Sequence, residues 1–89
     1  MIDLEDFTRL NEQVEEGRRA KELLDNATFQ HTLKYLKDTY SAQLFSTPDR
    51  ELRDTYYHQH VALQMIEQLL CHQVAQGEQA EYDLKDVTN

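Results

Sequence analysis

The sequence predicts an all-α fold, a small three-helix bundle made of an antiparallel helical hairpin, residues 27–45 and 48–76, and an N-terminal helix over residues 3–24. Two features of the composition favour helices. The 89 residues include only two glycines and one proline, which is too few for a sheet and its turns. Leu, Glu, Gln, Ala, Lys and Arg, which all favour helices, dominate the rest of the chain. A chain of this length allows one domain, residues 1–89.

The N-terminal helix is predicted because apolar side chains recur at steps of three and four residues. Phe7, Leu10 and Val14 begin this stripe, and Gly17 falls on it. A glycine in a helix interior costs about 1 kcal/mol relative to alanine. Either the helix weakens at Gly17, or a neighbouring backbone comes close to it.

The second helix, residues 27–45, follows a boundary at Asp25 and Asn26. Either side chain can cap a helix, because its oxygen accepts a hydrogen bond from a free N–H group at the helix start. The apolar positions that follow repeat at helical spacing. They are Phe29, Leu33, Leu36, Tyr40 and Leu44.

The third helix begins at the only proline. Ser46 or Thr47 is expected to supply the cap, and Pro48 suits the first helical position, where its missing N–H is no loss. So short a connection predicts an antiparallel pair. Gly77 predicts the end of the helix, which leaves residues 78–89 as a frayed helix or a mobile acidic tail. We expect no internal repeats.

The hairpin core is expected where the apolar stripes of the two long helices face each other. The side chains expected to be buried there are Leu33, Leu36, Leu63 and Ile66. The third helix is longer than the second, so its far end needs cover from the N-terminal helix or from a second subunit. Small chains have thin cores, and we therefore expect a homo-oligomer.

Candidate protein-contact residues come from this mismatch in length and from two tyrosines outside the core stripes. They are Tyr35, Tyr57, Leu69, Leu70 and Val74. Exposed tyrosines and apolar side chains are typical anchors of protein interfaces. The same residues also fit ordinary partial exposure, and both interpretations stay open.

The sequence predicts no catalytic, cofactor-binding or metal site, and therefore no enzyme. His58 and His60 point about 200° apart on a helix, so they cannot share a metal. Cys71 and His72 are adjacent and diverge in the same way. The single cysteine excludes a disulfide within the chain and favours a reducing compartment. We expect no small-molecule substrate.

The net charge of −8 is concentrated at the two ends of the chain. Residues 1–16 carry six acidic side chains against one arginine, and residues 78–89 carry four against one lysine. Such acidity disfavours direct nucleic-acid binding and suits docking on a basic surface. Arg50 and Arg53 lie among acids, which predicts a solvated face with ion pairs. Neither a signal peptide nor a membrane span is expected.

Three segments resemble small α-helical hairpin proteins of tailed bacteriophages and prophages: "AKELLDNATFQHTLKYLKDTY", "STPDRELRDTYYHQHVALQMIEQLL" and "VAQGEQAEYDL". The matching positions are Leu23, Leu24, Asn26, Phe29, Thr47, Asp49, Glu51, Arg53, Ala62, Leu63 and Gly77. Relatives often carry a proline where Ala27 stands here, and a tryptophan in the long helix.

Genes of such proteins tend to sit among head and packaging genes. The resemblance implies a non-enzymatic subunit of the virion or of head assembly, in contact with other phage proteins or with itself. It would then be found in the virion or the host cytoplasm. The alternative is a small acidic phage-encoded inhibitor that binds a host protein.

Overall fold

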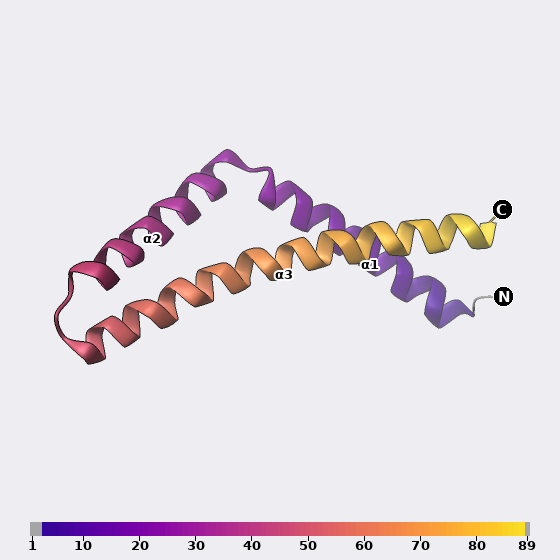
Figure 1. The fold of residues 1–89 in the computed structure, drawn as a ribbon. Coiled ribbons are helices and arrows are strands. Elements are labelled where there is room, and N and C mark those ends of the chain that lie inside the picture. The colour runs from indigo at the N-terminus through magenta and orange to yellow at the C-terminus, as the bar shows by residue number, and fades with distance from the viewer. Residues whose placement is uncertain (1–2, 89) are drawn as a thin grey trace. The chain divides into compact units, whose positions relative to one another are not determined.

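The computed structural model describes residues 3–88, and these residues form three α-helices and no strand (Figure 1). The helices are α1 (Leu4–Leu24), α2 (Ala27–Ser46) and α3 (Arg50–Thr88). The predicted all-α class is confirmed. The chain forms two compact units, and each is described by itself. One unit contains α1 and the part of α3 from Leu69 onward, and the other, Asp25–Gln68, contains α2 and the first part of α3.

Each helix begins behind a side chain that accepts a hydrogen bond from the backbone. The caps are Asp3, Asn26 and Asp49, and the Oδ1 atom of each accepts a hydrogen bond from the backbone N–H three residues further on. The distances are 2.8 Å for Asp3, 2.8 Å for Asn26 and 3.1 Å for Asp49. These bonds satisfy N–H groups that have no partner within the helix. Asn26 is one of the two caps predicted for α2.

The predicted start of α3 is wrong by two residues. Asp49 is the cap, and the helix begins at Arg50. Thr47 instead terminates α2, because its N–H donates to the Gln43 carbonyl at 3.0 Å while its own backbone is extended. Asp49 caps at least as well as serine or threonine, and it is the Asp49 side chain that accepts a hydrogen bond from the Leu52 N–H.

The predicted end of α3 at Gly77 is also wrong, because the helix continues to Thr88. A glycine that ends a helix adopts a positive φ, and no glycine of the described chain does so. Gly77 is buried within the helix instead. Its lack of a side chain serves the contact with α1.

α1 crosses the second half of α3 (Figure 1). The crossing brings the only two glycines of the chain together. A Cβ atom on Gly17 would lie 2.9 Å from the Gln73 carbonyl oxygen and 2.9 Å from the Gly77 Cα atom. A Cβ atom on Gly77 would lie 2.9 Å from the Gln13 carbonyl oxygen and 2.9 Å from the Gly17 Cα atom. Of the two explanations for Gly17, close approach of a neighbouring backbone is the one found.

These reciprocal distances reflect an internal repeat, so the expectation of none is wrong. Residues 10–24 and 70–84 share the pattern Leu-x2-Gln-Val-x2-Gly-x2-Ala-x3-Leu. The two copies run antiparallel where they cross (Figure 1). The reciprocal distances place a local twofold axis between them. Ala20 and Ala80, which correspond in the two copies, are both buried.

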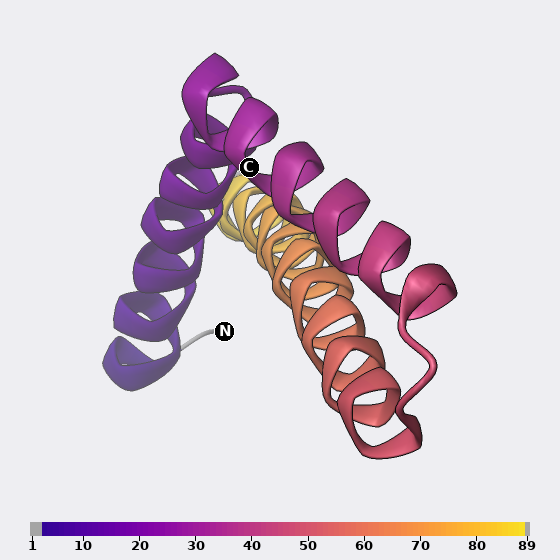
Figure 2. The same ribbon diagram turned by 90° about the vertical axis from the view of Figure 1, so that its left-hand side faces the viewer.

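The hairpin of α2 with the first part of α3 is antiparallel, as predicted (Figures 1 and 2). The Tyr40 and Tyr56 rings stack, with centroids 6.4 Å apart and planes 25° apart. The Lys37 Nζ atom lies 2.5 Å from a Glu67 carboxylate oxygen, and both side chains are about two-thirds buried. These two contacts join the helices across the pair.

The hairpin core matches the sequence prediction only in part. Leu33 is buried, as predicted, while Leu36 and Leu63 are half-buried. Ile66 is 46% exposed, so its predicted burial is wrong. The next residue along α3, Glu67, takes the position facing α2 and pairs with a lysine there. The apolar stripe therefore predicted the wrong face of α3 at this point.

Replacing Gly77 with alanine tests the crossing. Alanine favours a helix over glycine by about 1 kcal/mol, but the added Cβ would overpack the α1 backbone, and overpacking costs about 1–3 kcal/mol. Chemical denaturation should therefore show no gain in stability, and a loss of up to about 2 kcal/mol. The control is Gln76→Ala at the exposed neighbouring position, with little effect expected. A Gly77→Ala protein that is more stable than the parent would contradict the close contact.

Replacing Asp49 with alanine tests the start of α3. Loss of the cap should lower the free energy of unfolding by about 1 kcal/mol. The matched control is the double variant Ser46→Ala with Thr47→Ala, which removes the caps expected from the sequence. Denaturant titrations should rank the single variant as the less stable protein, and the reverse order would mean that the helix starts earlier.

Candidate protein-docking site

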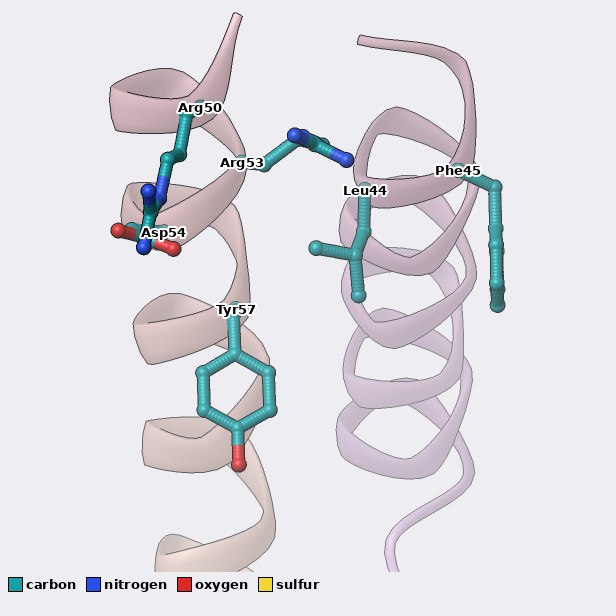
Figure 3. Close-up of a pocket in the computed structure, with 6 residues that line it drawn as sticks. All are labelled: Leu44, Phe45, Arg50, Arg53, Asp54 and Tyr57. Atoms are coloured by element: carbon teal, nitrogen blue, oxygen red, sulfur yellow. The ribbon is translucent and has the colours of Figure 1, made fainter. Parts of the chain in front are cut away.

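The turn between α2 and α3 carries an open groove, called here the turn groove (Figure 3). Its lining residues come from the last turn of α2 and the first two turns of α3. They are Leu44, Phe45, Arg50, Arg53, Asp54 and Tyr57. The three-residue connection between the helices keeps the two ends together.

Helical spacing places the α3 residues of the turn groove on one side of the helix. Arg50, Arg53 and Tyr57 follow at steps of three and four, so they lie above one another. In Figure 3, Arg53 and Leu44 project toward each other between the two helices. Phe45, the next residue along α2, projects away from α3 at the rim.

The aromatic side chains of the turn groove are unusually exposed. Phe45 is 87% exposed and Tyr57 is 53% exposed. A phenylalanine in water gives up the roughly 1.5–3 kcal/mol that its burial would contribute. Large aromatic side chains beside a groove are characteristic anchors of protein interfaces.

Neither arginine of the turn groove forms an ion pair with another described residue. Six of the nine lysines and arginines form ion pairs within the described residues: Arg9, Arg18, Arg19, Lys34, Lys37 and Lys85. Arg50 and Arg53 form none, although acids surround them in sequence, so the ion pairs expected there do not form. Two guanidinium groups are thus available to a carboxylate from outside the chain.

The paired charges elsewhere stabilise helices and do not build a reactive site. Hydrogen bonding to Arg18 lowers the pKa of the Glu15 carboxyl, and Lys34 lowers the pKa of the Asp38 carboxyl in the same way. Their contribution to stability is present above the ordinary carboxyl pKa and is lost as the pH falls through the lowered value. Both pairs are exposed, so the contribution is small.

The histidines and the cysteine do not gather into a site. Within residues 3–88, no three histidine, cysteine or acidic side chains are placed to hold a metal ion. Cys71 is exposed and free. His58 is exposed, with its ring centroid 5.9 Å from that of Tyr57. His60 is half-buried, and its Nδ1 atom has no hydrogen-bond partner among residues 3–88.

The predicted protein-contact residues fall into two groups. Tyr35, Tyr57 and Leu69 are exposed, and among them only Tyr57 lines the turn groove. Leu70 and Val74 are half-buried, and both line grooves shared with α1. α1 therefore covers part of the far end of α3, as the sequence analysis expected. The contact role of all five remains a prediction.

The sequence predicted only Tyr57 of the six groove residues as a contact residue. The five that it did not predict include Phe45, Arg50 and Arg53. Phe45 follows directly on Leu44, the last residue of the apolar stripe of α2, and so points about 100° away from it around the helix. That offset was a usable signal of exposure. The free arginines gave no such signal, because nearby acids in the sequence suggested ion pairs.

Comparison of the chain with protein-family models, with curated proteins and with solved structures finds no match in any of the three. Among the described residues, no helix has both the length and the apolar character needed to cross a bilayer.

Proposed function

We propose that this chain is a non-enzymatic protein that acts by protein–protein contact through the turn groove. Its setting is a tailed-phage particle or the assembly of its head, where it serves as a structural or accessory subunit. The observation that carries the contact role is Phe45, 87% exposed at the same end of the hairpin as two guanidinium groups that form no ion pair among the described residues. The phage setting rests on the sequence resemblance alone.

The chemistry of the turn groove indicates the kind of partner. Arg50 and Arg53 offer planar donors that match a carboxylate in two-bond geometry. Phe45, Leu44 and Tyr57 offer apolar area beside these charges. A partner segment with an acidic side chain next to an apolar one fits this arrangement, and another phage protein is the proposed source of that segment.

The second candidate is a small acidic inhibitor that binds a host protein. The exposed acids of the first unit favour it, namely Glu5, Glu12, Glu16, Glu78 and Asp86. Quantitative mass spectrometry of purified particles separates the two candidates. A fixed number of copies per particle supports the structural subunit, and absence from the particle supports the inhibitor.

Replacing Phe45 with serine together with Arg53 with glutamate tests the turn groove. We expect incorporation into particles to fall by roughly tenfold or more, because an aromatic hot spot and a charged contact each contribute about 1–2 kcal/mol or more to binding. The folded stability should change little, because both side chains are exposed.

The matched control is Tyr82→Ser, which removes another exposed aromatic side chain, 66% accessible, from the other unit. Incorporation should stay at the parent level in this control. Equal incorporation of the parent and the groove variant would contradict the role of the turn groove.

A further inference from the structure

The crossing of α1 and α3 forms a second groove, called here the crossing groove, on the local twofold axis. Each lining residue from α1 is matched by its repeat counterpart from α3. The residues are Val14, Gly17, Arg18 and Lys21 from α1, and Val74, Gly77, Glu78 and Glu81 from α3. The packing residues are therefore identical in the two copies.

The charges beside the crossing groove differ between the copies. α1 contributes two cations, Arg18 and Lys21, whereas α3 contributes Glu78 and Glu81 at the same repeat positions. Arg18 already pairs with Glu15 and Glu22, and Glu81 with Lys85, within their own helices. Pairing α1 with another α1 would therefore bring two Lys21 side chains together, and pairing two α3 segments would bring two Glu78 side chains together. Like charges disfavour both. The glycines permit close packing, and the charges select an α1–α3 pair.

We propose that a second copy of this chain is a partner for this surface. α1 of each copy packs on the second half of α3 of the other copy, giving a closed reciprocal dimer. Exchange of an identical element keeps every crossing contact and adds no new interface chemistry. The inference stands apart from the proposed function, which uses the turn groove.

The connection between α1 and α2 favours exchange. Only two residues, Asp25 and Asn26, form it, and short hinge connections promote exchange between copies.

Complementation between two full-length variants tests the exchange. Gly17→Val spoils the crossing surface of α1, and Gly77→Val spoils that of α3, because any Cβ there meets backbone atoms at 2.9 Å. Neither variant can form an intact crossing alone. A heterodimer of the two contains one crossing between an unmodified α1 and an unmodified α3.

The variants carry different affinity tags, are co-expressed, and are analysed by native mass spectrometry and thermal melting. We expect heterodimer at least about tenfold above the homodimer of either variant, corresponding to about 1.4 kcal/mol. The heterodimer should also melt at a higher temperature than either variant alone. Recovery of soluble protein only on co-expression would support exchange equally well.

The matched control co-expresses Gly17→Val with Gly17→Leu, a mixture that contains no unmodified α1. No complementation is expected there. Exchange is overturned if the Gly17→Val and Gly77→Val mixture behaves like this control, whether as monomers or as insoluble protein. Strong homodimers of Gly17→Val alone would overturn the selection by charge, because they require α3 to pair with α3.

Discussion

Contact between two glycine backbones is the constraint on which the pairing of α1 with the second half of α3 depends. Side-chain packing normally holds helices 8–10 Å apart, and glycine removes that spacer. At Gly17 and Gly77, the direction in which a Cβ would lie points at a backbone carbonyl oxygen of the other helix. Cα–H groups facing carbonyl oxygens recur at close helix contacts and add modest stability. Burial around this point is achieved by small residues such as Ala20 and Ala80 rather than by large ones.

Such economical packing leaves much apolar surface for other contacts. The apolar side chains that are buried in the described chain are Leu10, Ala20, Leu33 and Ala80, whereas large ones such as Phe45 and Tyr35 remain in water. The turn groove and the crossing groove differ in the side chains that line them. One combines aromatic side chains with free arginines, and the other combines identical packing residues with opposite charges. The proposed partner and the proposed second copy follow from these two chemistries.

The sequence predicted the fold class and the antiparallel hairpin because periodicity and composition report on those features directly. It misplaced the ends of α3, because Pro48 and Gly77 each have two structural uses and only the tertiary contact decides between them. By sequence, Gly77 is typical of a helix terminus, whereas in the structure it lies inside the helix and packs against Gly17. The turn groove was harder to predict from the sequence, because whether Arg50 and Arg53 form ion pairs depends on where their side chains point. The repeat, in contrast, was readable from the sequence once the two glycines were aligned.

The most direct test of this account is a nuclear Overhauser measurement on isotope-labelled protein, focused on the α protons of the two glycines. The account predicts a strong cross-peak between Gly17 and Gly77, because their backbones are in contact. It predicts weaker peaks from each glycine to the other helix near Gln13 and Gln73. Absence of the glycine–glycine peak, with α1 and α3 both helical by chemical shift, would contradict the central claim.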